Sequence, residues 1–354
     1  LCTAAMLASV ATGCTAQAAP TSSTANSSEA TAATATASAG IPKYVFLFIG
    51  DGMSYPQIQL TNYYLSASSK DASAKTVSVD GEQKTVLQSA HHLTMMDFPI
   101  AGSAQTYDST SFAPDSASTA TSIATGFKTW SGSINVSEDF KTEYETIAEK
   151  LKAQKDYKIG VISSVNLNHA TPAAFYAHQA SRNSYYEIGL ELIDSGFDYF
   201  AGGDFNQPTG KDEDQTDLYT LAEEAGYTVV KTTKEAEALT AESGPVIVIE
   251  ENVADSNAMP YDIDLKDGQW ALADYVRKGI EVLDNDNGFF MMVEGGKIDW
   301  ACHANDAASA IQDTIALDNA VKEAVEFYNE HPDETLIIVT GDHETGGLTI
   351  GYAG

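Results

Sequence analysis

The chain has 354 residues, of which 43% are hydrophobic, and its 50 acidic and 19 basic residues give a formal net charge of −31. The hydrophobic fraction allows a sizeable core in one large domain or two. The charge argues against a nucleic-acid-binding surface, because phosphate backbones need stripes of lysine and arginine that this chain lacks. If the ligand is a small anion, its site needs local positive charge, and metal ions are the obvious source.

The first twenty residues, LCTAAMLASVATGCTAQAAP, have the pattern of a secretory leader. An apolar stretch at 4–11 ends in small residues and is too short to span a bilayer. Two processing patterns compete. ATGC resembles a bacterial lipobox, which would leave a lipid anchor on Cys14, whereas AQA at 16–18 fits ordinary signal cleavage. We therefore predict an exported protein, periplasmic or extracellular, that is either lipid-anchored or released.

Residues 21–40 form a Ser/Thr/Ala tract, TSSTANSSEATAATATASAG, which follows the leader directly. Such a segment cannot bury enough apolar surface to offset its ordering entropy, so we predict a disordered tether. We place one folded domain at residues 41–354. The chain does not begin with methionine and stops just after a strand-like run, so we treat it as a fragment of a longer protein.

Short apolar runs alternate with stretches of helical periodicity from residue 44 onwards. The runs predict strands, and the periodic stretches predict helices. This alternation predicts an α/β fold with a doubly wound, mostly parallel central sheet and helices on both faces. The segment 205–260 is interpreted as an elaboration of the sheet edge. The predicted strands are 44–49, 158–163, 245–250, 289–296 and 335–344, and the predicted helices are 143–154, 217–225, 269–283 and 304–328.

Acidic residues follow three of the predicted strands. Asp51 follows the first, Glu294 and Asp299 lie in the segment MMVEGGKID that ends the strand at 289–296, and Asp342 with His343 ends the last. Each taken alone could simply cap the next helix. Ligands of such sheets bind outside the carboxyl ends of the strands, so we expect these side chains to meet there. Carboxylates packed that closely repel one another, which predicts a bound cation.

The spacing of these residues suggests how metal ions would be held. Asp299 and His303 are four residues apart, which places both on one face of a helix. Asp342 and His343 are adjacent and could reach one ion only from a loop. Mixed Asp/His ligation suits zinc, and all-oxygen ligation suits magnesium. Two such pairs bridged by Asp51 predict a two-metal site, with the ions about 3.5–4 Å apart, for in-line displacement at phosphorus.

Six segments together resemble the alkaline phosphatase family, in the order found there and from about residue 44 to the end. The resemblance implies hydrolysis of phosphate monoesters through a phosphoserine intermediate, at two zinc ions with an adjacent magnesium ion. It also implies small phosphomonoesters as substrates and allows a homodimer. The segments are IGDGM, PDSASTATSIATG, NHATPAAFYAHQASR, MPYDID, VEGGKIDWACHAND and TGDHETGG.

The same resemblance assigns roles to individual residues. Ser116, preceded by Asp115, is the implied nucleophile, at the start of an implied helix and with its oxygen next to the first zinc ion. Arg182 is implied to grip two phosphate oxygens with its planar fork. The implied metal ligands are Asp51, Asp342 and His343 for the first zinc, Asp299 and His303 for the second, and Asp51, Glu294 and Thr171 for magnesium.

Two departures from the family pattern concern the metals. His169 stands where many bacterial relatives have aspartate, which predicts a third site that is looser, water-filled or prefers zinc. The further histidine that completes the second zinc site in the family comes after the last residue of this chain. We therefore expect weak zinc binding at Asp299 and His303 and poor activity of the chain as it stands.

Two alternatives remain at this level. One is a related two-metal hydrolase, such as a phosphodiesterase or sulfatase; Ser116 together with Arg182 favours monoesters over these. The other is a non-catalytic, metal-stabilised surface lipoprotein that only binds phosphate.

Overall fold

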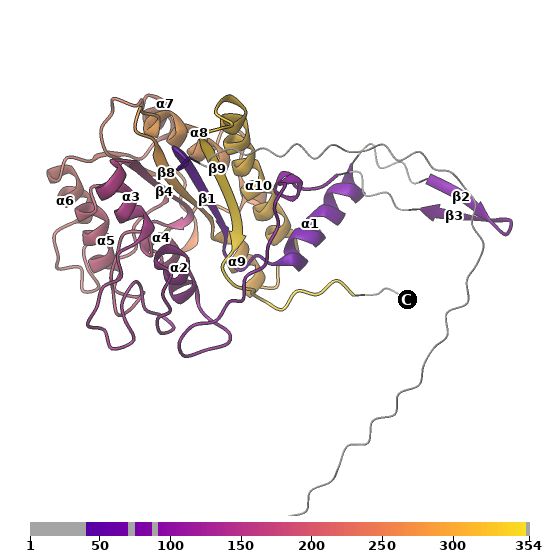
Figure 1. The fold of residues 1–354 in the computed structure, drawn as a ribbon, viewed down its shortest axis with the longest axis horizontal. Helices are drawn as coiled ribbons and strands as arrows, with labels where there is room; N and C mark the ends of the chain where they lie inside the picture. Colours follow the sequence, from indigo (N-terminus) through magenta and orange to yellow (C-terminus); the bar gives the residue numbers. More distant parts are fainter. Residues whose placement is uncertain (1–39, 70–74, 87–90, 352–354) are drawn as a thin grey trace, which may run out of the picture. The chain divides into compact units, whose positions relative to one another are not determined.

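A computed structural model describes residues 40–69, 75–86 and 91–351. The predicted leader and almost all of the predicted tether lie outside these residues. Seven strands form one sheet in the order β6-β7-β5-β4-β8-β1-β9, and every pairing in it is parallel (Figure 1). The strands are β1 (Tyr44–Gly50), β4 (Lys158–Asn166), β5 (Tyr199–Gly203), β6 (Thr228–Val230), β7 (Val246–Ile249), β8 (Phe289–Gly295) and β9 (Thr335–Gly341). The predicted fold class is confirmed.

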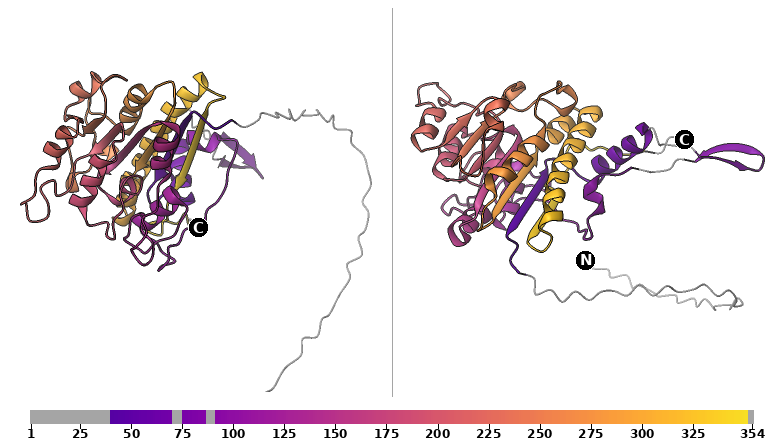
Figure 2. Two further views of the ribbon diagram at one scale, coloured as in Figure 1. Left: turned by 60° about the vertical axis from the view of Figure 1, so that its left-hand side comes forward. Right: turned by 90° about the horizontal axis from the view of Figure 1, so that it is seen from above.

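Helices pack on both faces of this sheet (Figures 1 and 2). α8 and α10 cover one face, and α2, α3 and α4 lie on the other. The helices are α1 (Tyr55–Ser68), α2 (Ser116–Thr125), α3 (Ile147–Lys155), α4 (Ala170–Ala173), α5 (Tyr185–Asp194), α6 (Leu218–Glu224), α7 (Thr233–Glu237), α8 (Leu272–Leu283), α9 (Lys297–His303) and α10 (Ala307–Glu330); short 3-10 turns are η1 (Thr94–Asp97), η2 (Asp255–Asn257) and η3 (Asp262–Asp264). A separate antiparallel pair consists of β2 (Lys75–Val79) and β3 (Glu82–Val86).

The apolar run of β1 is continuous because both of its faces are buried. Phe46 and Phe48 belong to the core beneath α8 and α10, whereas Leu47 and Ile49 belong to the core on the other face. Successive side chains of a strand point to opposite faces, so a strand between two helix layers needs an apolar residue at every position. This arrangement explains why the sequence showed an apolar run and no alternation.

The element boundaries differ from the predictions where capping side chains decide them. The helix predicted at 143–154 begins at Ile147, because Thr146 accepts a hydrogen bond from the Glu149 amide and forms a capping box. The helix predicted from 304 begins at Ala307, because Asp306 accepts from the amides of Ala308 and Ser309. The two short strands β5 and β6 were not predicted. The segment 205–260 does lie at the sheet edge, since it contains β6 and β7.

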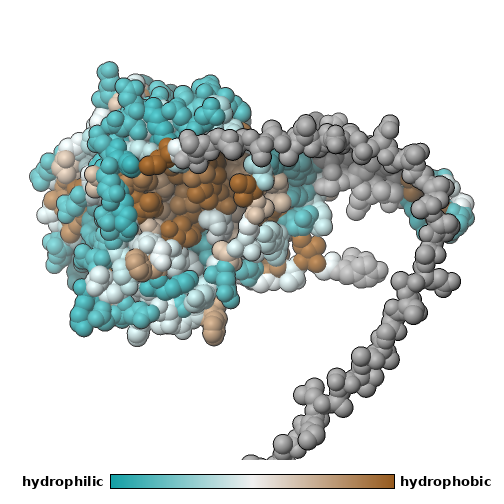
Figure 3. Space-filling model, viewed as in Figure 1, coloured by the Kyte–Doolittle hydropathy of each residue, from teal (hydrophilic) through white to brown (hydrophobic). Residues whose placement is uncertain are grey.

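The last strand, β9, forms one edge of the sheet, and its side chains are only partly covered. Leu336 and Ile338 are each 41% exposed. Figure 3 shows a hydrophobic area in the region where Figure 1 places β9 and β1. Within the described residues, no helix is both long and apolar enough to cross a membrane.

His178 joins two helices on the α3 side of the sheet. Its Nε2 lies 3.6 Å from a Glu149 oxygen on α3, and its Nδ1 lies 3.4 Å from a Glu191 oxygen on α5. Burial alone lowers the pKa of His178, but its hydrogen bonds to Glu149 and Glu191 and the charges of these carboxylates raise it to about 10. The imidazolium is therefore part of the fold at neutral pH.

We expect the variant His178→Gln to lose stability in a pH-dependent way. The folded-state pKa is raised above the ordinary value of 6.5, so the stabilisation is complete below pH 6.5 and disappears as the pH rises through about 10. Allowing for solvent screening, the loss should be on the order of 2 kcal/mol at pH 6 and close to zero at about pH 11. Urea unfolding at both pH values measures it. His92→Gln, at an exposed histidine, is the matched control, and an equal loss at both pH values would contradict the prediction.

Candidate metal centre and active site

Three neighbouring strands bring the predicted acidic residues to one edge of the sheet. β1 lies between β8 and β9, with Ile49 paired to Glu294 and Gly50 paired to Gly341. Asp51 and Asp342, each one residue further along, therefore end their strands at the same level. The parallel register creates the cluster, because each strand alone contributes only one or two carboxylates.

Asp51, Asp342 and His343 form the first group that could hold a metal ion, and all three are buried. His343 Nε2 lies 3.3 Å from Asp51 Oδ1 and 3.4 Å from Asp342 Oδ2. Burial, followed by the charges of Asp342, Asp299 and Glu294, raises the pKa of Asp51 well above its usual range. Burial likewise raises the pKa of Asp342. A divalent cation would offset both effects, and the mixture of oxygen and nitrogen donors fits zinc.

Ser116 is the first residue of α2, and its side chain faces this group. Its Oγ lies 3.3 Å from His343 Nε2 and 3.5 Å from Asp51 Oδ1. The N-cap of α2 is Asp115, and the helix is ten residues long. The Ser118 amide of the first turn is capped by Asp115 Oδ1, and the amides of Ser116 and Ala117, which have no acceptor within the helix, favour an anion beside Ser116. The predicted helix start at Ser116 is confirmed.

Arg182 is held beside Ser116 by Asp115. Arg182 Nη1 donates a 2.8 Å hydrogen bond to Asp115 Oδ2, while Asp115 Oδ1 accepts from the amide of Gly132 and from Ser118. Burial alone raises the pKa of Asp115, but the hydrogen bond from Gly132 and the hydrogen bond and charge of Arg182 lower it overall. Asp115 is thus ionised and fixed at both oxygens, so it holds the guanidinium beside the nucleophile candidate.

Asp51, His169 and Glu294 form the second group that could hold a metal ion. Glu294 Oε1 and His169 Nδ1 are buried and have no hydrogen-bond partner. Burial raises the pKa of Glu294 to about 7 against the hydrogen bond from Ser163, and burial with the Arg182 charge lowers the pKa of His169 to about 3. Thr171 Oγ1 lies 3.5 Å from Asp51 Oδ2. A neutral imidazole and a carboxylate oxygen without partners fit a bound cation.

Asp299 and His303 lie on the short helix α9, as predicted, with 3.5 Å between Asp299 Oδ1 and His303 Nε2. Asp299 is buried, whereas the His303 side chain is 72% exposed. Within the described residues, no third carboxylate, histidine or cysteine joins them to make a three-ligand group. Cys302, between them on α9, is a buried free cysteine.

Several supporting residues were missed by the sequence reasoning. Thr119 donates to Asp342 Oδ2, and Thr345 donates a 2.6 Å hydrogen bond to Asp299 Oδ1. Thr119 lies three residues after Ser116, so helical spacing could have placed it towards the same site. Gly52 has a φ of +67°, and a Cβ there would lie 2.8 Å from Thr345 Oγ1 and 2.9 Å from Asp299 Oδ1. Glycine is needed at this turn, because a side chain would displace two groups of the site.

A pocket of about 450 Å³ opens onto these groups. It is large enough for a phosphate group together with part of the molecule that carries it. It is lined by Pro114, Asp115, Ser116, His169, Arg182, Asp299, Trp300, His303, His343, Glu344, Thr345 and Gly346.

The fold and the site together define a doubly wound α/β protein with a candidate divalent-metal centre and a serine at a helix N-terminus beside it. Residues 42–354 match the model of the family described as alkaline phosphatase. The chain belongs to the alkaline phosphatase family.

Curated relatives agree with this assignment. Alkaline phosphatase 4 of Bacillus subtilis (strain 168) is 32% identical over 88% of this chain and 63% of its own length. The repressible alkaline phosphatase of Saccharomyces cerevisiae is 29% identical over 72% of this chain and 49% of its own. The chain thus spans about half to two thirds of the length of these relatives.

Solved structures also match. The alkaline phosphatase of the Antarctic bacterium TAB5 is 31% identical, with a TM-score of 0.71 over 87% of this chain and 80% of that one. A cold-active alkaline phosphatase from a psychrophilic Shewanella species is 30% identical, with a TM-score of 0.72 over 88% of this chain and 70% of that one. Two TAB5 variants, in which a histidine is replaced by glutamate or aspartate, are described with magnesium bound in the M3 site.

Proposed function

We propose that the protein hydrolyses small phosphate monoesters through a phosphoserine intermediate on Ser116. The observation that carries the proposal is the placement of Ser116 Oγ at the N-terminus of α2, 3.3 Å from His343 Nε2 and on the same pocket as Arg182. Family membership supports the same activity.

In this proposal the residues of the chain have separate roles in binding the phosphoryl group and in attacking it. Arg182 binds two oxygens of the phosphoryl group, and the amides of the first turn of α2 bind a third, which leaves the phosphorus facing Ser116 Oγ. Ser116 Oγ then forms the bond to phosphorus as the bond from phosphorus to the ester oxygen breaks, and the alcohol leaves with the proton that the Ser116 hydroxyl gave up. Water later cleaves the phosphoserine, which releases inorganic phosphate and restores the serine hydroxyl. Asp115 keeps Arg182 in place throughout.

The proposed ligands are Asp51, Asp342 and His343 for one zinc ion, Asp299 and His303 for another, and Asp51, Glu294 and Thr171 with nearby His169 for magnesium. When bound, these ions supply positive charge that favours the serine alkoxide and the departing oxygen. The two three-residue groups and the unpartnered atoms of Glu294 and His169 support the first and third sets. The second set rests on the resemblance and on the Asp299–His303 pair alone.

The proposed reaction is tested by comparing p-nitrophenyl phosphate with bis(p-nitrophenyl) phosphate on the zinc- and magnesium-loaded protein. We expect kcat/KM for the monoester to exceed that for the diester by about a hundredfold or more, because the site binds three free phosphoryl oxygens. A higher rate on the diester would assign the protein to the phosphodiesterase type. Phosphate binding without turnover of either ester would assign it to the binding-protein alternative.

We expect the variant His169→Asp to bind magnesium more tightly. An aspartate gives the third site an additional hard oxygen ligand, which magnesium prefers to imidazole nitrogen. The TAB5 variants with magnesium in the M3 site support this direction. The magnesium concentration for half-maximal thermal stabilisation should fall about tenfold. His169→Asn, which adds no charge, is the matched control, and an unchanged magnesium titration of the aspartate variant would contradict the prediction.

We also propose that the protein acts outside the cytoplasm. The leader pattern supports export, and a matching relative from Bombyx mori is described as a membrane-bound alkaline phosphatase. The lipid anchor at Cys14 and the homodimer remain predictions.

A further inference from the structure

Lys297, the first residue of α9, is a buried cation next to the active-site pocket. It is only 2% exposed. Its Nζ lies 3.8 Å from the ring centroid of Tyr261 and 4.7 Å from that of Trp300. No carboxylate of the described residues lies within 4.0 Å of this Nζ. The direct partners of the ammonium are therefore two aromatic faces. Such cation–π contacts stabilise a cation more strongly when it is desolvated.

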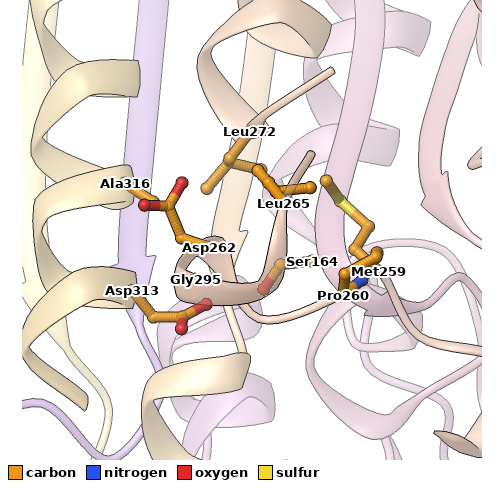
Figure 4. Close-up of a pocket in the computed structure, with 9 residues that line it drawn as sticks. All are labelled: Ser164, Met259, Pro260, Asp262, Leu265, Leu272, Gly295, Asp313 and Ala316. Atoms are coloured by element: carbon orange, nitrogen blue, oxygen red, sulfur yellow. The ribbon is translucent and has the colours of Figure 1, made fainter. Parts of the chain in front are cut away.

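Asp313 on α10 acts on Lys297 from further away: burial lowers the pKa of Lys297, and the charges of Asp313, Asp255 and Asp264 oppose this. Asp313 is buried beside a cavity of about 10 Å³, and Figure 4 shows its carboxylate directed from α10 towards the turn that carries Asp262. Burial and the Asp262 charge raise the pKa of Asp313 to about 8, while the Lys297 charge opposes them. Asp313 Oδ2 has no hydrogen-bond partner. Because this attraction acts without direct contact, it leaves the orientation of the ammonium to the aromatic rings.

Trp300 connects this buried cation to the site. Its indole lines the 450 Å³ pocket together with Ser116 and Arg182. The ring of His169 meets it in an edge-to-face contact, with centroids 6.0 Å apart and planes at 74°. Trp300 thus has the Lys297 ammonium on its face and the His169 ring beside it, and both contacts restrict the rotation of the indole.

We propose that Lys297 is a positioning residue, whose ammonium holds the indole of Trp300 as a fixed wall of the pocket and thereby strengthens the binding of phosphate. The inference rests on the proposed function, because it assigns the pocket to a phosphoryl group. Two effects act in the same direction. The cation–π contact orders the wall, and the buried positive charge adds attraction for an anion in a strongly acidic protein.

The test uses the metal-loaded protein with inorganic phosphate as the probe. The variants are Lys297→Met, which keeps the apolar stem, Lys297→Arg, which keeps a cation that can stack, and Lys297→Met/Asp313→Asn, which removes both charges and so avoids an uncompensated buried carboxylate. Calorimetry gives the Kd for phosphate. Acrylamide quenching of fluorescence gives the accessibility of Trp300. The Trp300 signal is the fluorescence of each protein minus the fluorescence of the same protein carrying Trp300→Phe.

We expect the Kd for phosphate to rise about tenfold in Lys297→Met and in the double variant, and to stay within about twofold of the wild type in Lys297→Arg. The quenching constant of Trp300 should rise in Lys297→Met and in the double variant, and should stay at the wild-type value in Lys297→Arg. A lower Tm with unchanged Kd and unchanged quenching would reduce Lys297 to a structural residue and overturn the inference. If the wild-type protein neither binds phosphate nor turns over a phosphate ester, the proposed function fails, and the positioning of Trp300 is then decided by quenching alone.

Discussion

Replacing Ser116 by alanine is expected to abolish covalent labelling of the protein by a phosphate monoester and to lower kcat by about 10³-fold or more. Ser116 Oγ is the hydroxyl oxygen that points at the Asp51–Asp342–His343 group from the end of α2, and it is the atom proposed to receive the phosphoryl group. Alanine leaves the pocket, Arg182 and the metal ligands in place. The loss therefore concerns the covalent step, and affinity for phosphate should change little.

The measurement is incubation with a ³²P-labelled monoester at mildly acidic pH, followed by acid quench and counting of the precipitated protein. The matched control is Ser122→Ala on the same helix, where the hydroxyl only donates to the Ser118 carbonyl. This control should be labelled like the wild type. Labelling of Ser116→Ala at the wild-type level would exclude the serine as the nucleophile. Turnover without labelling in either protein would point to direct attack by water.

Replacing Asp51 by asparagine should remove most of the stabilisation that zinc and magnesium give to the protein. Asp51 belongs to both three-residue groups, so one substitution weakens both. Metal bound at a thousandfold excess over its Kd stabilises a protein by about 4 kcal/mol. For a chain of this size we expect a metal-dependent rise in Tm of about 8 °C in the wild type, and about 2 °C or less in the variant. Monoester hydrolysis should fall at least about a hundredfold.

The same variant should be at least as stable as the wild type when a chelator is present. Burial and the charges of Asp342, Asp299 and Glu294 raise the pKa of Asp51, which means that the fold disfavours its ionised form. A neutral asparagine carries no such penalty at pH 8.

Thermal unfolding with chelator and with metal measures both effects. Asp318→Asn is the matched control, because Asp318 is also buried but accepts hydrogen bonds from the amides of Thr94 and Met95 and belongs to neither metal-ligand group. It should lower Tm and leave the metal-dependent increment intact. An increment in Asp51→Asn equal to that of the wild type would exclude Asp51 as a shared ligand.

Much of the framework could be predicted from local patterns. The run at 44–49 is apolar at every position because β1 is covered on both faces, and that feature is visible in the sequence itself. The four-residue spacing of Asp299 and His303 placed them on one helix, and α9 contains both. β5 was missed because its five residues end in two glycines, a composition that also occurs in turns. Such a strand is stabilised by its neighbours β4 and β7, which local composition does not show.

The amino-acid sequence by itself determined the strand and helix types of the longer elements and the carboxylates at the strand ends, because each depends on residues near one another in the chain. Only the tertiary structure decided that β1 lies between β8 and β9, which brings Asp51, Glu294 and Asp342 together. It also decided that Asp115 holds Arg182, and that the Lys297 ammonium lies between Tyr261 and Trp300. These contacts join residues far apart in sequence, and they form only when the apolar faces of sheet and helices are buried against one another.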